Sequence, residues 1–271
     1  MDATLLTIII LGIVEGLTEF VPVSSTGHLI LAAELLGFTG EAAGTFHIVI
    51  QLGAILAVIV LYWRRFLGVA AGLVRAEAGA IAFTRNIALG FLPSALVGLL
   101  VYELVKAMLE QPMIVAVALF LGGIAILVIE RLVKVPTTPS VEEMSWKVAL
   151  GVGIVQCLSM IPGVSRSGAT IIGALALGVE RKAAAEYSFF LAVPTMLAAS
   201  GYDLVKTGAA LSDGAWSGIA VGFVVSFVTA LVVIRWFIAL VSRHGFAPFA
   251  WYRIVAGAVA MVWLLARGQA G

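Results

Sequence analysis

Charged residues are scarce in this chain of 271 residues. Only 11% are Asp, Glu, Lys or Arg, whereas 62% are hydrophobic, and the mean hydropathy is +1.14. Soluble globular domains carry about 25% charged residues, so the composition excludes that class and indicates a protein that crosses a membrane several times. The formal net charge of +1 gives no bulk field for nucleic acid, and we expect no nucleic-acid partner.

Cysteine and long polar segments are also nearly absent. Cys157 is the only cysteine, so the chain has no internal disulfide and no cysteine metal cluster. No basic region precedes the first apolar run, so we expect no cleaved signal peptide. The polar connections around 64–85 and 134–146 are too short to fold alone. We therefore expect a single membrane domain, 1–271.

Apolar windows fill most of the chain. A spanning helix needs about 20 predominantly apolar residues, and six windows approach or exceed that length: Phe46–Trp63, Ile87–Val105, Met113–Val133, Tyr187–Val205, Trp216–Leu240 and Phe249–Ala266. Regions 4–37 and 147–179 are apolar too, but Pro, Gly, Ser and Thr break each into halves too short to cross. We interpret both as re-entrant helix-loop-helix hairpins, whose irregular backbone must face protein or a water-filled cavity.

The two hairpin regions resemble each other. The segment beginning at Gly12, Gly-Ile-Val-Glu-Gly-Leu-Thr, recurs at Gly153 as Gly-Ile-Val-Gln-Cys-Leu-Ser, and the same spacing aligns Ser24 with Ser165. This duplication predicts repeat 1 at about 1–135 and repeat 2 at about 147–271, each with one hairpin and three spans. Three crossings per half is an odd number, so the halves must be inverted. We expect an all-α polytopic fold in which the hairpins meet tip to tip.

The basic residues predict the orientation, since cytoplasmic loops carry an excess of Lys and Arg. With the connection after the first span in the cytoplasm, Lys106, Lys206 and Arg267 lie outside, as do both termini. The cytoplasmic side then carries Arg64, Arg65, Arg75, Arg85, Arg131, Lys134, Lys147, Arg181, Lys182 and Arg243.

The first hairpin carries acids, hydroxyls and an imidazole. Glu15 and Glu19 are four positions apart, so on a helix they share one face, and charges at membrane depth are expected to face a cavity or a partner. Ser24, Ser25 and Thr26 follow Pro22 as N-cap residues of a second half-helix, a favourable anion site. Ser25 could act as a nucleophile, with His28 three residues on as its base.

The second hairpin carries an arginine among small polar residues, Ser165-Arg166-Ser167-Gly168-Ala169-Thr170. Hydroxyls and close-approaching backbone around a guanidinium suit phosphate oxygens. We therefore expect Ser165, Ser167, Gly168 and Thr170, with Ser24 and Thr26, to bind substrate around Arg166. Arg166 could instead form a salt bridge with Glu15 or Glu19, a pairing also compatible with an empty anion site.

Both motifs resemble those of the bacterial undecaprenyl-diphosphate phosphatases of the bacitracin-resistance type. They read Glu-Gly-Leu-Thr-Glu-Phe-Val-Pro-Val-Ser-Ser-Thr-Gly-His from Glu15 and Pro-Gly-Val-Ser-Arg-Ser-Gly-Ala-Thr from Pro162. The resemblance covers essentially the whole chain. It implies hydrolysis of undecaprenyl diphosphate to the monophosphate and phosphate, which recycles the lipid carrier of cell-wall synthesis in the inner membrane, and it favours a site open to the periplasm.

In our preferred mechanism Ser25 attacks the terminal phosphoryl group and His28 takes its proton, while Arg166 clamps the oxygens. Glu15 and Glu19 would hold a divalent cation, Mg2+ or Ca2+, or orient His28 and water. Direct attack by His28 remains open.

Three further interpretations compete with this one. Inverted repeats and midplane carboxylates also suit a transporter, and the same cavity could let the lipid flip across the membrane. Another class of lipid phosphatases uses a histidine six residues after a Ser-Arg pair, but Ile172 stands there. Gly72, Gly122, Gly123 and Gly257 permit close helix packing, internally or in a homodimer.

Overall fold

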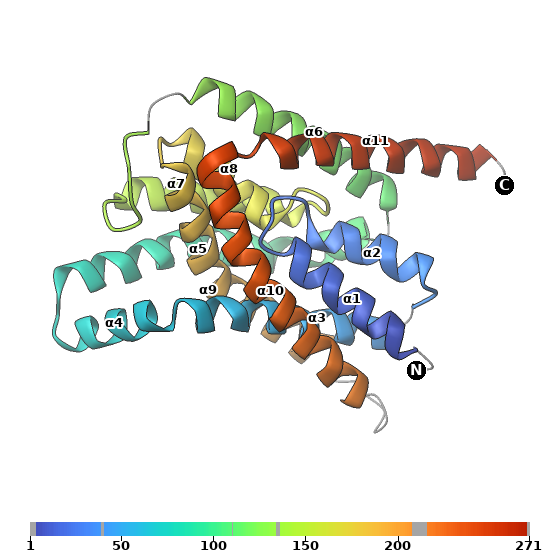
Figure 1. The fold of residues 1–271 in the computed structure, drawn as a ribbon, viewed down its shortest axis with the longest axis horizontal. Coiled ribbons are helices and arrows are strands. Elements are labelled where there is room, and N and C mark those ends of the chain that lie inside the picture. Colours follow the sequence, from blue (N-terminus) through green and yellow to red (C-terminus); the bar gives the residue numbers. More distant parts are fainter. Residues whose placement is uncertain (1–3, 39–40, 110, 134–135, 208–215, 270–271) are drawn as a thin grey trace.

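The computed structural model describes residues 4–38, 41–109, 111–133, 136–207 and 216–269 (Figure 1). Helices make up nearly all of these residues. In chain order they are α1 (Leu5–Thr18), α2 (Ser25–Leu35), α3 (Glu41–Leu61), α4 (Trp63–Val74), α5 (Ala78–Leu109), α6 (Pro112–Leu132), α7 (Trp146–Gln156), the 3-10 turn η1 (Cys157–Met160), α8 (Arg166–Ala176), α9 (Arg181–Thr207), α10 (Trp216–His244) and α11 (Ala247–Gln269).

Six of the helices in these ranges are long and apolar enough to cross a membrane: α3, α5, α6, α9, α10 and α11. They coincide with the six apolar windows, so the prediction of a polytopic all-α protein is confirmed at this level. The protein is a multi-pass membrane protein. The first span ends at Leu61, two residues before the end of its apolar window, and Trp63 begins the separate helix α4.

Helix α5 is the element whose length the sequence least predicts. The apolar window begins at Ile87, but the helix begins at Ala78 and continues past Arg85 and Asn86 to Leu109. Its 32 residues extend about 48 Å at 1.5 Å per residue, beyond the ~30 Å hydrocarbon core. Asn86 does not interrupt the helix because its side-chain amide donates to the Met144 carbonyl at 2.6 Å. The polar residues therefore mark where the apolar window begins but not where the helix begins.

Both apolar regions outside the spans are helix pairs with a break between them. Helix α1 ends before Glu19 and α2 starts at Ser25, while η1 ends at Met160 and α8 starts at Arg166. Proline stands in both breaks, at Pro22 and Pro162, where it cannot continue a helix. The first break also contacts the start of α8, because the Ser167 hydroxyl donates to the Val21 carbonyl at 3.0 Å. The two helix pairs therefore touch near their breaks, and the tip-to-tip meeting of two re-entrant hairpins stays a prediction.

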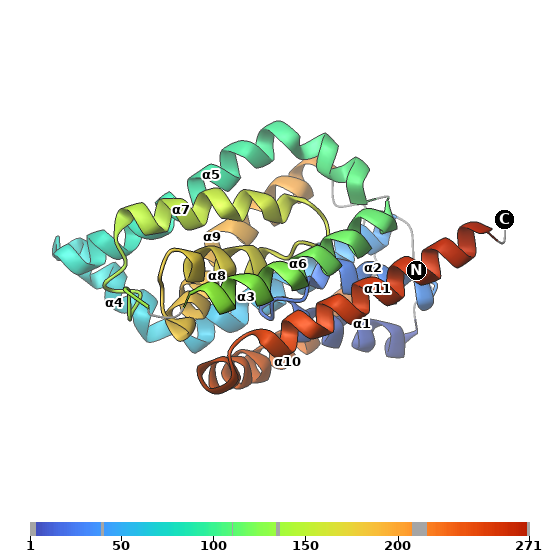
Figure 2. The ribbon, with the colours of Figure 1, turned by 90° about the horizontal axis from the view of Figure 1, so that it is seen from above.

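Each hairpin packs against a long helix of the other half of the chain. Helix α1 lies along α10, and α7 lies along α5 (Figure 2). Glycines permit both contacts: a Cβ on Gly12 would lie 2.9 Å from the Gly222 carbonyl, and one on Gly153 would lie 2.6 Å from the Gly90 carbonyl. Close backbone approach without room for a side chain is the packing that membrane helices use in place of hydrophobic burial. These contacts hold each helix pair against a helix of the other half of the chain.

Helices α6 and α11 lie side by side in both ribbon views. A Cβ on Gly123 would lie 2.7 Å from the Ala250 carbonyl, and one on Gly257 would lie 2.7 Å from the Phe120 amide nitrogen. Gly122 faces Arg253, and Gly72 faces Ala80. All four glycines singled out for close packing are therefore used within one chain, and the homodimer stays a prediction that they do not support.

Candidate active site

Two serines with matching conformations open the second helix of each hairpin. Ser24 has φ 73° and Ser165 has φ 75°, a region that residues other than glycine rarely adopt. Each is an N-cap: Ser24 Oγ accepts from the Gly27 amide at 3.4 Å, and Ser165 Oγ accepts from the Gly168 amide at 3.1 Å. Positive φ in a serine costs on the order of 1–3 kcal/mol and is found mainly at functional sites. The two breaks are thus constrained in the same way.

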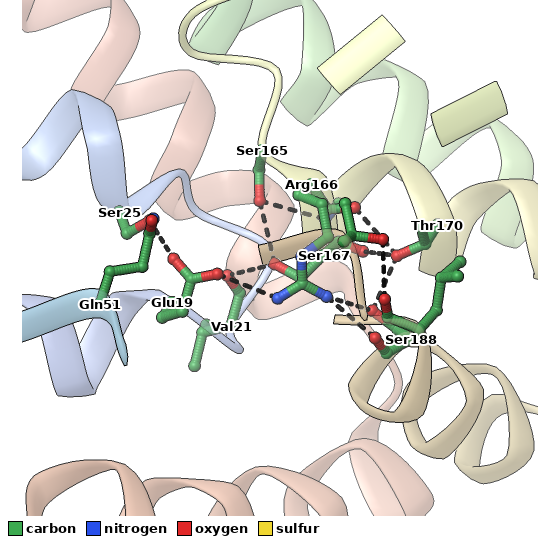
Figure 3. A network of polar contacts seen from close by, with 12 residues as sticks. Glu19, Val21, Ser25, Gln51, Ser165, Arg166, Ser167, Thr170 and Ser188 are labelled. Carbon is green, nitrogen blue, oxygen red and sulfur yellow. Dashed lines mark hydrogen bonds and ion pairs between the residues drawn. The ribbon is translucent and has the colours of Figure 1, made fainter. Parts of the chain in front are cut away.

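Glu19 joins the two hairpins at the breaks (Figure 3). Its Oε2 accepts a hydrogen bond of 2.5 Å from the Ser25 hydroxyl, and its Oε1 lies 3.0 Å from Arg166 Nη2. The side chains of Glu19 and Arg166 are only 3% and 9% exposed. The salt bridge considered for Arg166 is therefore present with Glu19. One buried carboxylate contacts both the candidate nucleophile and the candidate phosphate clamp.

Further donors of Arg166 and its neighbours form a polar network between the second hairpin and Ser188 of α9. Arg166 Nη1 donates to the Ser188 carbonyl at 2.9 Å and to its hydroxyl at 3.2 Å. Thr170 Oγ1 lies 2.7 Å from Ser188 Oγ, and Ser165 Oγ lies 3.0 Å from Ser167 Oγ. Arg166 Nε is buried without a hydrogen-bond partner among the described residues. The guanidinium is therefore held in place by Glu19 and Ser188, while its Nε–H remains unused.

His28 lies apart from this network. One ring nitrogen, Nδ1, is 2.8 Å from the Ser24 carbonyl, and the other, Nε2, is 2.5 Å from the Tyr252 hydroxyl. Its ring also stacks on Tyr252. Both nitrogens are engaged, so the expected hydrogen bond from Ser25 to His28 is not formed. Ser25 donates to Glu19 instead.

Glu15 is fully buried, and neither of its carboxylate oxygens has a hydrogen-bond partner within the described parts of the chain. It lies close enough to Glu19 and Arg166 to interact with their charges. A buried carboxylate without a partner needs a proton or a cation. Glu15 and Glu19 together fit a cation only if substrate or water oxygens supply the rest of the ligands of that cation. No group of three or more His, Cys, Asp or Glu side chains suited to a metal occurs in the ranges that the structure describes.

A cavity of about 610 Å³ opens at the breaks. Glu19, Ser25 and Arg166 line it, as do Ser24, Thr26 and Ser165, whereas Glu15, His28, Ser167, Gly168 and Thr170 do not. From there it follows helices α5 and α9 past Phe91, Ala95, Leu99 and Met196 to Tyr102, Lys106 and Asp203. The lining residues of α5 run from Phe91 to Leu109, about 27 Å along a helix. A polar end and a long apolar wall suit an amphipathic ligand.

The family model described as Bacitracin resistance protein BacA matches residues 8–259, from within α1 to within α11. The chain belongs to the BacA family. Three relatives carry the name undecaprenyl-diphosphatase. The protein of Rhizorhabdus wittichii is 65% identical over 98% of this chain and 100% of the relative. The protein of Sphingopyxis alaskensis is 63% identical over 96% of this chain and 98% of the relative. The protein of Novosphingobium aromaticivorans is 56% identical over 97% of this chain and 99% of the relative.

Two residues that contact the candidate site were missed in the sequence. Ser188 binds Arg166, but a serine at the start of an apolar window gives no signal of its own. Arg253 contacts both breaks through their carbonyls. Its signal was available, because an arginine inside an apolar span is expected to have a function.

Proposed function

We propose that this protein is an integral membrane phosphatase of the bacterial inner membrane. It hydrolyses undecaprenyl diphosphate to undecaprenyl phosphate and inorganic phosphate, and so recycles the lipid carrier for peptidoglycan synthesis. The observation that carries the proposal is Glu19, which contacts Ser25 and Arg166 at the polar end of an apolar-walled cavity. BacA family membership and the names of the relatives support the same substrate.

Different parts of the cavity bind different parts of the substrate. The isoprenoid tail lies along α5 and α9, and the diphosphate reaches Arg166, whose guanidinium matches phosphate oxygens in a bidentate manner. Ser24, Thr26 and Ser165 supply hydroxyls on the same lining. Ser167, Gly168 and Thr170 do not line the cavity. They contribute indirectly, because their contacts fix the position of α8 and of Ser188.

The chemical step begins at Ser25. Its Oγ attacks the terminal phosphorus, an Oγ–P bond forms, and the bond to the bridging oxygen breaks with release of undecaprenyl phosphate. Glu19 accepts the serine proton, because it already receives that hydrogen bond at 2.5 Å. Water then attacks phosphoserine and releases phosphate, with proton return through Glu19. This replaces His28 as the base, since both ring nitrogens of His28 are engaged elsewhere.

A divalent cation, Mg2+ or Ca2+, fits the two carboxylates incompletely. Glu15 offers two unpartnered oxygens and Glu19 lines the cavity, so Glu15 and Glu19 would hold the ion while substrate and water oxygens complete its ligands. When bound, it would neutralise charge on the phosphoryl oxygens.

The inverted repeat with re-entrant hairpins is part of the proposal. The contacts are exchanged between the halves: α1 packs on α10 as α7 packs on α5, and α3 packs on α10 as α9 packs on α5. Gln156 donates to Ser94 at 2.6 Å, and Glu15 and Ser226 occupy the corresponding positions of the other half. We further propose that both termini lie outside and that the site opens to the periplasm.

Phosphate release from undecaprenyl diphosphate by the purified protein in detergent tests this function. We expect Ser25→Ala and Arg166→Ala to lower kcat on the order of 10²-fold or more, and a chelator to abolish release until Mg2+ or Ca2+ is restored. Ser242→Ala is the matched control, because Ser242 is an exposed serine of α10 that does not line the cavity. Near-normal activity of Ser25→Ala would overturn the serine mechanism, and absence of release by the unaltered protein would overturn the function.

Lipid flipping is a second candidate, favoured by the exchanged packing of the two halves around a cavity. Movement of a labelled lipid across proteoliposomes that contain Ser25→Ala would separate flipping from hydrolysis. No movement above that in protein-free vesicles would exclude it.

A further inference from the structure

Arg253 is a charged residue buried in the apolar helix α11. It is only 1% exposed, and none of the ion pairs within the described ranges includes it. Burying a charge without an acidic partner costs several kcal/mol unless hydrogen bonds compensate. An arginine retained under those conditions needs an explanation in the structure around it.

All five N–H groups of Arg253 donate to backbone carbonyls. Nη1 donates to Pro22 at 3.0 Å and to Val164 at 2.9 Å, and Nη2 donates to Gly163 at 3.0 Å and to Ala118 at 3.2 Å. Nε donates to Leu119 at 3.3 Å. A guanidinium has five donors in a planar fork, so its capacity is used completely. The acceptors come from both hairpin breaks and from α6.

These contacts fix the two breaks relative to each other just behind the reacting groups. Val164 directly precedes Ser165 and Arg166, and Pro22 lies between Glu19 and Ser25. Because a trans peptide is planar, the Val164 carbonyl that faces Arg253 turns the Ser165 N–H to the opposite side. Arg253 itself does not line the cavity. It therefore acts on the shape of the site and not on the substrate.

We propose that Arg253 is a positioning residue that keeps the Ser25–Glu19 pair of the first hairpin aligned with Arg166 of the second. This inference rests on the proposed phosphatase function. The nucleophile and the clamp sit on different hairpins, and one guanidinium spans both breaks. Loss of the planar Arg253 guanidinium would let Ser25 move away from the phosphorus while Arg166 still binds the diphosphate.

Arg253→Lys is the direct test, because lysine keeps the charge but has three donors and no planar fork. We expect kcat for undecaprenyl diphosphate to fall on the order of 10²-fold, as a displacement of about 1 Å at a reacting group can cause, while KM changes less than threefold. Arg166→Lys, which alters a substrate contact, is expected to raise KM. Arg235→Lys is the matched control, because Arg235 is an exposed arginine on α10.

Gly122→Ala gives a second route if Arg253→Lys does not fold. A Cβ on Gly122 would collide with the Arg253 guanidinium, whereas one on Gly44 would meet nothing within 4 Å. We expect Gly122→Ala to lower kcat and Gly44→Ala to leave it unchanged. Unchanged kcat in folded Arg253→Lys and in Gly122→Ala, or a raised KM with normal kcat, would overturn the positioning role. Inactivity of the unaltered protein would instead overturn the phosphatase proposal.

Discussion

Ser25 and His28 illustrate how side-chain partners depend on one backbone angle. They are three positions apart on α2, a spacing that allows a hydrogen bond between them. Ser24, however, takes φ 73° at the cap. In the resulting helix start, the Ser25 hydroxyl meets Glu19 and His28 meets Tyr252 of α11. In the proposed mechanism the acid-base pair is therefore Ser25 with Glu19.

This assignment predicts unequal effects of two substitutions. Glu19→Gln removes the proton acceptor of Ser25 and one partner of Arg166, so we expect kcat to fall on the order of 10²- to 10⁴-fold. His28→Gln changes a residue outside the cavity lining, and we expect a loss of less than about tenfold from the altered cap and Tyr252 contact. Steady-state kinetics of the two purified variants provide the measurement. A loss in His28→Gln equal to that in Glu19→Gln would restore histidine as the base.

The sequence pointed to Glu19, Ser25 and Arg166, which line the cavity, better than it pointed to their partners. Glu19, Ser25 and Arg166 stood out because polar groups interrupt an apolar chain, and that contrast is a local property. Positive φ at Ser24 and Ser165 has no comparable signal in serine. The role of Arg253 depends on α11 packing against α6, which no motif encodes. Ser188 was missed for the same reason. Its role depends on hydrogen bonds to residues of the neighbouring helix α8.

At the scale of elements, glycine positions decide which helices can touch. The contact of α7 with α5 passes through Gly153, where a Cβ would lie 2.6 Å from the Gly90 carbonyl. A backbone carbonyl cannot move aside as a flexible side chain can, so added volume must separate the helices. The apolar windows predicted the spans, but only the recurrence of Gly12 as Gly153 hinted at these contacts.

Gly153→Ala is accordingly expected to destabilise the protein by about 1–3 kcal/mol, the range for overpacking. In a protein of this size that corresponds to roughly 2–4 °C in Tm per kcal/mol. Thermal unfolding in detergent gives the measurement. Gly44→Ala is the control, because it adds the same methyl group to open space in α3. An equal Tm for the two variants would show that α7 and α5 are not held by this contact.

At the scale of the whole molecule, orientation is the main untested prediction. The arrangement with both termini outside places the connection between α5 and α6 outside and the connection before α7 in the cytoplasm. Gln111 and Glu143 are exposed residues on these two connections. Cys157 is the only native cysteine and can be replaced by serine to give a background for labelling.

In that background, Gln111→Cys is expected to react with a membrane-impermeant thiol reagent on intact cells, because it faces outward. Glu143→Cys is expected to react only after the membrane is permeabilised. Mass-tag shifts of the purified variants provide the readout. The reverse pattern would invert the whole topology, and equal labelling of both positions before permeabilisation would contradict the number of crossings between them.

The contacts of Gly12 with Gly222 and of Gly153 with Gly90 also bear on the order in which the protein assembles. During synthesis, α1 emerges first but its packing partner α10 is made only after some 200 further residues. When the second hairpin is synthesised, its packing partner α5 has already been made. The packing of the first hairpin on α10 therefore forms late, and the candidate site can be completed only when nearly the whole chain has been translated.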